Sequence, residues 1–504
     1  MILLINPPLV KPSEPPPGIA RLYGTLRAEG AACAVIDANL EGILHLFGKN
    51  PPDPDRWTRR AVRNKSRNFD LIRSPQGYLD LQHYKRAVSD LNRLIGKAVE
   101  ISRVRITLSD YQDPDLSPVR SADLLMAAQR YENTPFHEYF SKRIPRAMEL
   151  HLPDIVGISL SFLSQALTAF SIIGFIKARY ERVRIVLGGS LVTSWSSNPH
   201  WKNPFQGLID HVVSGPGEQP LLDLAGLGGR VARKRFSYEP FALRDYLAPG
   251  PILPYSASLG CYWNRCAFCP EKAERVCYEP LPPKSAALEA RRLCSQSRPS
   301  LVHFVDSAIS PALLSELSKN PPCAPWYGFV RVTKRLADEE FCRALKLSGC
   351  IMLKLGLESG DQGVVDSEGK GMDLSVAARA LASLKKAGIG TYVYLLFGTP
   401  SESENEARNT LDFTVRHAPF IDFLNLAIFN MPVNSPDAER FATALHYEGD
   451  LSLYTGFSHP KGWGRLKVRR FLDAEFKKHP AIARILLNEP PFFTSNHAPL
   501  FVGN

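Results

Sequence analysis

The start of the chain alternates between short apolar runs and a stretch with helical periodicity. Residues 2–6 are nearly all apolar, the apolar positions of 19–29 repeat at the helical period, and 33–38 form a second apolar run. Gly30 follows the helical stretch, at a position where glycine commonly ends a helix. This order predicts a strand, a helix and a second strand, which together open a βαβ unit.

The same alternation returns after residue 154. Apolar runs over 155–162 and 184–189 flank a helical pattern over 166–180, and a short apolar run over 211–215 follows. Combined with the first segment, these runs predict an α/β domain built on a doubly wound, Rossmann-like parallel sheet.

A segment of different character, residues 41–152, separates the two halves of this sheet. Its amphipathic stretches, such as 78–99, predict helices, and it has neither a dense glycine loop nor paired metal ligands. We interpret it as a helical insertion within an N-terminal domain that spans 1–235. Residues 230–254 are rich in proline and glycine, which predicts a linker to the next domain.

Six apolar runs alternate with helical patterns downstream of this linker. Helices are expected over 338–347 and 374–387, the second with Asp373 as N-cap and Gly388 as C-cap. The alternation predicts a partial (β/α)6 barrel over 250–430, with its chemistry at the C-terminal ends of the strands. The expected strands are 255–260, 301–306, 326–332, 350–359, 391–398 and 423–430.

The length and composition fit several globular domains. At roughly 150 residues per domain, 504 residues allow about three units, and 431–504 would be a small, mainly helical C-terminal region. The 44% hydrophobic and 22% charged residues exclude a mainly disordered, collagen-like or coiled-coil chain. A net charge of +11 suits an anionic ligand, a nucleic acid or an acidic surface without selecting one. No apolar stretch is long enough to span a membrane or to form a signal peptide, so we expect a cytoplasmic protein.

The cysteines carry the clearest chemical signal. Their number, nine, is odd and favours a reducing compartment over a disulfide scaffold. Cys261, Cys266 and Cys269 are spaced C-x4-C-x2-C after the first expected barrel strand. A structural zinc site wants four ligands, for which Cys277 is the nearest candidate, and a ferredoxin-like cluster also needs a fourth cysteine. Three thiolates with an open position match a 4Fe–4S cluster whose fourth iron is free for a substrate or cosubstrate. The remaining five cysteines fall in strand or helix patterns and are expected to be small core residues: Cys33, Cys294, Cys323, Cys342 and Cys350.

With this cysteine loop the chain resembles the radical S-adenosylmethionine (SAM) superfamily, in its cobalamin-binding branch. The resemblance covers about residues 1–40 and 154–430. It implies that the three cysteines hold a 4Fe–4S cluster, that SAM binds the fourth iron, and that reductive cleavage of SAM yields a 5′-deoxyadenosyl radical. Phe268 occupies the aromatic position before the third cysteine, where the backbone would meet the adenine of SAM. The spacing has one residue more than the commonest C-x3-C-x2-C pattern of the family.

Other residues at the ends of the barrel strands agree with this resemblance. Glu358 stands where family members place a polar or acidic group on the ribose or amine of SAM, although a lone glutamate at a strand end is often only a surface charge. Asp306 is a candidate for contact with SAM or substrate. Arg331 could pair with the SAM carboxylate or form an ordinary salt bridge of the barrel. The turn that starts at Gly398 resembles the Gly-x-Pro-Gly-Glu-Thr turn that lies near the adenine in the family.

The N-terminal sheet resembles the cobalamin-binding domain of the same branch, in which small residues at strand ends let the corrin approach the backbone. Phe162 and Leu163, with the preceding serine, would lie beside the lower corrin face. The Asp-x-His-x-x-Gly signature that supplies a histidine to cobalt is absent. A generic doubly wound sheet that binds another ligand is the alternative. The candidate cobalamin-binding residues are Ser161, Gly188, Gly189, Thr193, Gly215 and Glu218.

The resemblance implies a cobalamin-dependent methyltransferase that acts on an unactivated carbon and uses SAM both as radical source and as methyl donor. A small-molecule or peptide substrate and a reductant such as flavodoxin or ferredoxin are the expected partners, and no nucleic acid is expected. The alternatives are a radical SAM enzyme of rearrangement, cyclisation or methylthiolation, and a non-catalytic iron–sulfur or zinc protein that binds nucleic acid. A methylthiotransferase would usually carry three more cysteines in its N-terminal domain, where only Cys33 occurs.

Overall fold

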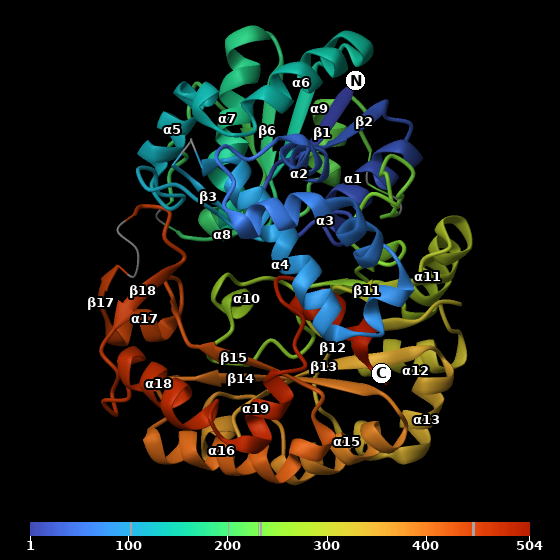
Figure 1. The fold of residues 1–504 in the computed structure, drawn as a ribbon, viewed down its shortest axis with the longest axis vertical. Helices are drawn as coiled ribbons and strands as arrows, with labels where there is room; N and C mark the ends of the chain where they lie inside the picture. The colour runs from blue at the N-terminus through green and yellow to red at the C-terminus, as the bar shows by residue number, and fades with distance from the viewer. Residues whose placement is uncertain (101–102, 200, 230, 232–233, 446–448, 504) are drawn as a thin grey trace. The chain divides into compact units, whose positions relative to one another are not determined.

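The computed structural model describes residues 1–100, 103–199, 201–229, 231, 234–445 and 449–503. The described chain divides into two compact units. Unit 1 consists of Met1–Pro251 and two short returns of the chain further on, and unit 2 begins at Ile252 and contains most of the remaining residues. Each unit is built on one parallel sheet (Figure 1).

The sheet of unit 1 has five parallel strands in the order β2-β1-β5-β6-β7. Numbered consecutively within the sheet, this is the 2-1-3-4-5 order of flavodoxin-like folds, whose ligands bind where the strand order reverses. The reversal lies between β1 and β5, and the doubly wound prediction is confirmed. The strands are β1 (Ile2–Asn6), β2 (Cys33–Asp37), β5 (Ile155–Ser159), β6 (Arg184–Gly188) and β7 (His211–Val212).

Four helices of unit 1 connect or follow these strands: α1 (Pro17–Ala28), α7 (Leu163–Arg179), α8 (Ser190–Ser196) and α9 (Glu218–Leu224). The described part of the insertion consists of helices and one short antiparallel pair of strands. Its elements are α2 (Ala38–Gly48), α3 (Arg56–Ile72), η1 (Pro75–Tyr78), α4 (Leu81–Ala98), β3 (Arg105–Ile106), β4 (Tyr111–Gln112), α5 (Ser121–Gln129), η3 (Tyr131–Asn133) and α6 (His137–His151).

The sheet of unit 2 has six parallel strands in the order β15-β14-β13-β12-β11-β8, so the six expected repeats form an open, partial barrel. The strands are β8 (Ile252–Tyr255), β11 (Leu301–Phe304), β12 (Trp326–Val330), β13 (Cys350–Glu358), β14 (Gly390–Phe397) and β15 (Phe423–Ile428). Figure 1 shows their helices following one side of the sheet. These are α11 (Pro283–Ser297), α12 (Pro311–Lys319), α13 (Glu339–Leu347), α15 (Leu374–Lys386) and α16 (Glu404–His417).

The prediction of the first barrel strand is wrong in its bounds. The strand is β8, most of which lies in the expected linker. Of the expected 255–260 run, only Tyr255 belongs to β8, and Ser258–Leu259 forms β9, which pairs antiparallel with β10 (Glu279–Pro280). Pro254 lies inside β8, and β8 is an edge strand, where a missing backbone N–H is tolerated. The prolines that predicted a linker therefore belong in part to a strand.

Shorter elements complete unit 2. They are α10 (Pro270–Ala273), η4 (Lys334–Ala337), α14 (Gln362–Ser367), η5 (Ala418–Phe420), α17 (Pro436–Phe441), α18 (Arg465–Phe471), η6 (Leu472–Phe476), α19 (Pro480–Leu486), α20 (Thr494–His497) and η7 (Ala498–Phe501). The C-terminal region also contains an antiparallel sheet that the sequence pattern did not predict, made of β16 (Met431–Pro432), β17 (Ala442–Leu445) and β18 (Tyr454–Phe457).

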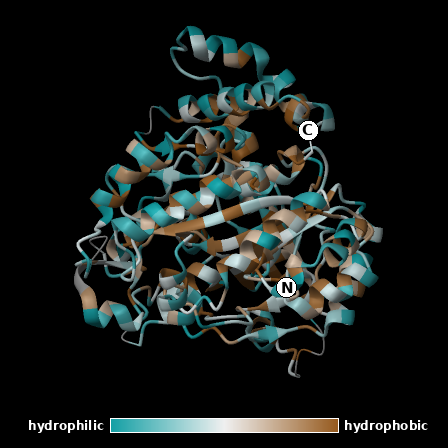
Figure 2. Cartoon of the chain, turned by 90° about the horizontal axis from the view of Figure 1, so that it is seen from below, coloured by the Kyte–Doolittle hydropathy of each residue, from teal (hydrophilic) through white to brown (hydrophobic). Residues whose placement is uncertain are grey.

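Hydrophobic residues concentrate on the strands and the inner helix faces, and hydrophilic residues on the outer helices (Figure 2). The strands of both sheets are largely buried, with Leu3, Ile185 and Leu353 among many residues that expose nothing. In the part of the chain that the structure describes, no helix is long and apolar enough to cross a membrane.

Candidate functional site

The cysteine loop of unit 2 joins β9 to α10. The side chains of Cys261, Cys266 and Cys269 are half-buried in it, and none is in a disulfide. Gly260, just before the loop, has φ +68°, and a Cβ there would come within 2.7 Å of the Cys277 carbonyl oxygen. Asn264 has φ +45°, a conformation that asparagine tolerates better than most residues. The four-residue spacer of the C-x4-C motif thus includes a left-handed turn.

The three thiols are close enough to influence one another. Burial raises the pKa of Cys266, the nearby Lys370 and Arg331 lower it, and Glu358 and Cys261 raise it. Burial also raises the pKa of Cys269, to about 11, with Cys266 contributing in the same direction. Two cations, Lys370 and Arg331, and the carboxylate Glu358 thus act on Cys266, and the sequence places them on three separate segments.

A second loop, residues 368–371, holds the cysteine loop by its backbone. The Ala267 N–H donates to the Glu368 carbonyl oxygen at 2.9 Å, and the indole N–H of Trp263 donates to the Gly369 carbonyl oxygen at 2.9 Å. Gly371 has φ +60°, and a Cβ there would lie 2.2 Å from the Trp263 ring. Because a side chain cannot fit at this position, the glycine allows the two loops to pack closely.

Lys370, at the tip of this second loop, forms an ion pair with Glu358. Its Nζ lies 2.7 Å from Glu358 Oε1 and 5.6 Å from the centre of the Phe268 ring. Lys370 is 6% exposed; burial lowers its pKa, but the charges of Glu358 and Cys266 outweigh burial and raise it. A Cβ on Gly356 would come within 2.6 Å of Glu358 Oε1 and 2.8 Å of Lys370 Nζ, so the glycine provides the space for the pair.

Arg331 is buried and packs against the cysteine loop. Its guanidinium lies 3.7 Å from the centre of the Trp263 ring and donates to the Lys370 carbonyl oxygen. No ion pair between Arg331 and another described residue is present. Its Nε is buried without a hydrogen-bond partner among those residues, which leaves one donor for an anionic group.

Asp306, at the end of β11, is occupied by structural hydrogen bonds. It is 3% exposed and accepts from the Ala257 N–H at 3.1 Å and from the Ser258 hydroxyl. Burial raises the pKa of this carboxyl, and these two donors lower it. The carboxylate therefore fixes the backbone that leads into β9 and the cysteine loop.

The turn after β14 begins at Gly398, which has φ +81°. Glu402 Oε2 accepts the Gly398 N–H at 2.5 Å and the indole N–H of Trp463 at 3.0 Å. Glu402 is fully buried, burial raises its pKa to about 8, and its Oε1 has no partner among the described residues. A buried carboxyl thus holds this turn in shape.

A segment of the C-terminal region, residues 459–463, binds the same turn. His459 Nε2 lies 2.8 Å from the Thr399 carbonyl oxygen, and Lys461 Nζ donates to the Ser401 carbonyl oxygen. The Trp463 indole donates to Glu402 of the same turn. His459, Lys461 and Trp463 therefore all bind the turn from one short segment. Phe268 lies nearby in unit 2 and packs against a hydrophobic cluster formed by Phe429, Met431 and Ala438.

The remaining cysteines divide into buried and exposed groups. Cys33, Cys294, Cys342 and Cys350 are buried, as predicted, whereas the prediction for Cys323 is wrong, because it is exposed in the loop between α12 and β12. Cys277 is exposed. Within the described ranges, no group of three or more histidine, cysteine, aspartate or glutamate side chains is placed to hold a single metal ion. A cluster of four irons takes each cysteine on a different iron, whereas a single zinc ion takes all of its ligands itself.

The candidate cobalamin residues of unit 1 lie at the C-terminal edge of its sheet. The backbone N–H groups of Ser161 and Phe162 both donate to Gln165 Oε1 at 3.1 Å, and the Phe162 side chain is 58% exposed. Gly189 has φ +115°, and a Cβ there would lie 2.3 Å from the Leu160 carbonyl oxygen. At Gly188, by contrast, the nearest atom would be 3.5 Å away. Of the two glycines, only Gly188 has space for another atom at the place where a Cβ would lie, and we call this its open side.

Two further candidates, Thr193 and Glu218, bind other residues of unit 1. The Thr193 hydroxyl donates to the Gly189 carbonyl oxygen at 3.0 Å and accepts the Gly215 N–H at 2.9 Å, so it links the two glycine loops. Glu218 is 1% exposed and lies 2.5 Å from Arg21 Nε, which joins α9 to α1. These side chains shape the sheet edge.

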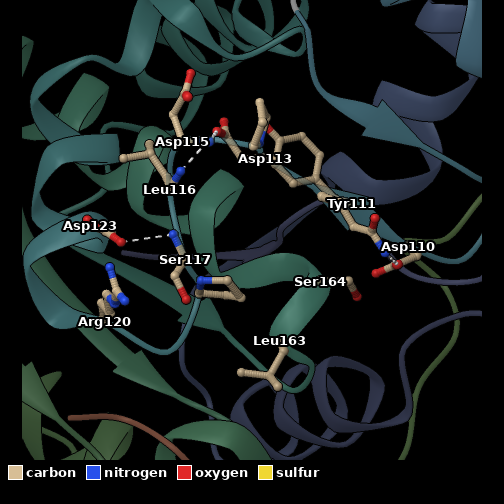
Figure 3. A pocket seen from close by; sticks show the side chains of 13 residues that line it. Asp110, Tyr111, Asp113, Asp115, Leu116, Ser117, Arg120, Asp123, Leu163 and Ser164 are labelled. Carbon is tan, nitrogen blue, oxygen red and sulfur yellow. Dashed lines mark hydrogen bonds between the residues drawn. The ribbon is translucent and has the colours of Figure 1, made fainter. Parts of the chain in front are cut away.

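A cavity of about 490 Å³ lies between the insertion and the start of α7 (Figure 3). Leu163 and Ser164 line one side of it, and a loop of the insertion lines the other. Asp113 accepts the N–H groups of Asp115 and Leu116, and Asp123 accepts that of Ser117. Asp113 and Asp123 thus cap nearby backbone groups of the insertion.

Sequence reasoning missed three residues of the unit 2 site: Lys370, Glu368 and Glu402. The Gly-Lys-Gly sequence at 369–371 is the signal that could have identified Lys370, because two glycines around a lysine suggest a tight loop. Glu402 occupies the glutamate position of the motif that we recognised only from Gly398.

Comparison with known proteins identifies solved structures that have a similar fold. No protein-family model matches the chain, and no curated protein matches it. Among solved structures, the chain is similar to the cobalamin-dependent SAM radical enzyme OxsB with aqua-cobalamin and SAM bound, with a TM-score of 0.58 and 13% identity over 94% of this chain and 67% of that one. A second OxsB structure, with aqua-cobalamin bound, gives a TM-score of 0.51 and 14% identity over 66% of this chain, which spans only 60% of that one.

The radical SAM methyltransferase TsrM from Kitasatospora setae, with cobalamin and a [4Fe-4S] cluster bound, is similar with a TM-score of 0.54 and 17% identity over 92% of this chain and 84% of that one. These likenesses confirm the fold predicted from the sequence. It is the fold of the cobalamin-dependent radical SAM enzymes, with an α/β unit of flavodoxin-like order and a partial barrel.

Proposed function

We propose that this protein is a radical SAM enzyme that cleaves SAM reductively at a 4Fe–4S cluster. The observation that carries the proposal is the constellation at the cysteine loop: three half-buried thiols, with Glu358, Arg331 and Lys370 around them. Three half-buried thiols on one loop suit a cubane with one open iron. When bound, the cluster supplies the electron that cleaves SAM to methionine and a 5′-deoxyadenosyl radical.

The residues around the loop have separate roles in this proposal. The three cysteines hold the cluster. Glu358 Oε2, which no described residue binds, accepts from the amino group of SAM, and the free Nε of Arg331 donates to the SAM carboxylate. The turn at Gly398, held by Glu402, offers backbone groups to the adenine.

We further propose that unit 1 binds cobalamin and that the reaction is methylation of an unactivated carbon in a small molecule. An exposed phenylalanine at the sheet edge, Phe162, suits an apolar macrocycle face, and the open side of Gly188 allows close approach to the backbone. A similar structure supports this choice: TsrM is a radical SAM methyltransferase and was also solved with a tryptophan substrate bound.

The central experiment is anaerobic reconstitution with iron and sulfide, followed by incubation with SAM and dithionite. We expect about four irons per chain and the formation of 5′-deoxyadenosine. Cys266→Ala should abolish 5′-deoxyadenosine formation, whereas Cys277→Ala, which alters an exposed thiol outside the motif, should leave the iron content and the cleavage unchanged. A wild-type protein that binds only zinc, or that binds a cluster without cleaving SAM, would refute the proposal.

A further inference from the structure

Lys370 forms an ion pair with Glu358, but the proposed roles in binding the cluster and SAM do not account for this lysine. Lys370 is buried, and its carbonyl oxygen accepts from Arg331. The residues on both sides of it are tied to the cysteine loop, through Gly369 to the Trp263 indole and through Gly371 against the Trp263 ring. The backbone thus fixes the ammonium beside the cysteines.

The two charges of the pair are opposite in sign and lie beside the cysteine loop. Lys370 Nζ lies 5.6 Å from the ring centre of Phe268, the residue before Cys269, and 2.7 Å from Glu358 Oε1. Since the side chains of Lys370 and Glu358 are only 8% and 19% exposed, water screens their charges incompletely, and an anionic group nearby feels each of them. A cluster at these cysteines would gain negative charge on reduction, so a neighbouring cation favours the reduced form and a neighbouring carboxylate opposes it.

We propose that Lys370 is a positioning residue that neutralises Glu358 beside the cluster and thereby sets the reduction potential of the cluster. The inference rests on the proposed function, because it requires a 4Fe–4S cluster at these cysteines. Without Lys370, the carboxylate required for SAM would stand uncompensated next to an anionic cluster. With it, Glu358 keeps one oxygen on the ammonium and presents the other to SAM.

The test is a redox titration of the reconstituted cluster, monitored by electron paramagnetic resonance in the absence of SAM. Lys370→Gln removes the charge and keeps a hydrogen-bond donor for Glu358, so the midpoint potential should become more negative. Glu358→Gln removes the opposite charge and should make it more positive. The double variant should return close to the wild-type value, because the pair as a whole is neutral. Lys370→Arg keeps the charge and should shift the potential less than Lys370→Gln.

The outcomes separate this inference from the function on which it rests. If the single variants shift the potential in the same direction, or by no more than Lys370→Arg does, the inference is overturned while the radical SAM proposal stands. If the wild-type protein takes up no 4Fe–4S cluster, both fall. Iron content is measured for each variant, and loss of iron in Lys370→Gln with normal iron in Lys370→Arg would point to cluster retention and would overturn a role in potential.

Discussion

Glu402 shows how one buried side chain can make a site depend on pH. It is fully buried, and burial raises its pKa to about 8, whereas the ordinary value is 4.5. Between these two values the unfolded chain loses the proton and the folded chain keeps it. Stability contributed by this residue therefore falls as pH rises through this window, by up to about 1.4 kcal/mol per pH unit, and levels off above pH 8.

Glu402→Gln should remove this dependence. The amide oxygen still accepts from Gly398 and Trp463, while the amide nitrogen replaces the protonated oxygen. We expect the difference in apparent Tm between variant and wild type to increase in favour of the variant from pH 5 to pH 8. The control is Glu404→Gln, at an exposed carboxylate of α16. Parallel pH profiles for Glu402→Gln and wild type would contradict the prediction.

The residues that sequence reasoning identified are those whose signal is local. The three cysteines stand within nine positions of one another, and Asp373 caps α15 by accepting from Ser375 and Val376, as predicted. Lys370 was missed because its importance comes from a contact with Glu358, twelve residues away, and from loop packing that no short pattern encodes. Cys323 was misplaced because a cysteine beside prolines gives no signal of its exposure.

At the level of elements, periodicity predicted both sheets, and proline misplaced one strand. The parallel sheet of unit 1, though not its strand order, and the six parallel strands of unit 2 follow from alternating apolar and helical segments. The start of β8 was hidden by Pro251 and Pro254, since proline marks linkers and edge strands alike. The short strands β16–β18 were missed because two to four residues carry too little pattern.

Two neighbouring glycines at the end of β6 allow a test of the sheet edge. Gly189→Ala places a Cβ against the Leu160 carbonyl oxygen in a conformation that favours glycine, and should cost at least about 2 kcal/mol of stability. Gly188→Ala meets only ordinary contacts and should stay within about 1 kcal/mol of wild type.

If a corrin approaches the open side of Gly188, the alanine there should lower the retention of cobalamin without lowering the apparent Tm. Bound corrin is measured by absorbance after purification with cobalamin supplied. A Gly188→Ala protein that retains as much corrin as wild type would exclude approach at this position, and one as unstable as Gly189→Ala would show that the structural distinction is wrong.

At the level of the whole molecule, the proposed cofactors divide between the two units. Every candidate cobalamin residue lies in unit 1, and the cysteine loop with Lys370, Glu358 and Arg331 lies in unit 2. Each unit has its own sheet and its own buried core, so damage to the cysteine loop should leave the fold of unit 1 intact.

This division predicts that cluster and cobalamin can be lost separately. Cys266→Ala should fail to form 5′-deoxyadenosine and yet retain about as much cobalamin per chain as wild type, because the half-buried thiol lies on a loop and outside either core. Iron content, corrin absorbance and thermal unfolding are compared for Cys266→Ala and Cys277→Ala prepared in parallel. Loss of corrin from Cys266→Ala alone, with normal unfolding, would mean that cobalamin binding requires the cluster-bearing unit, and the assignment of the corrin to unit 1 would have to be abandoned.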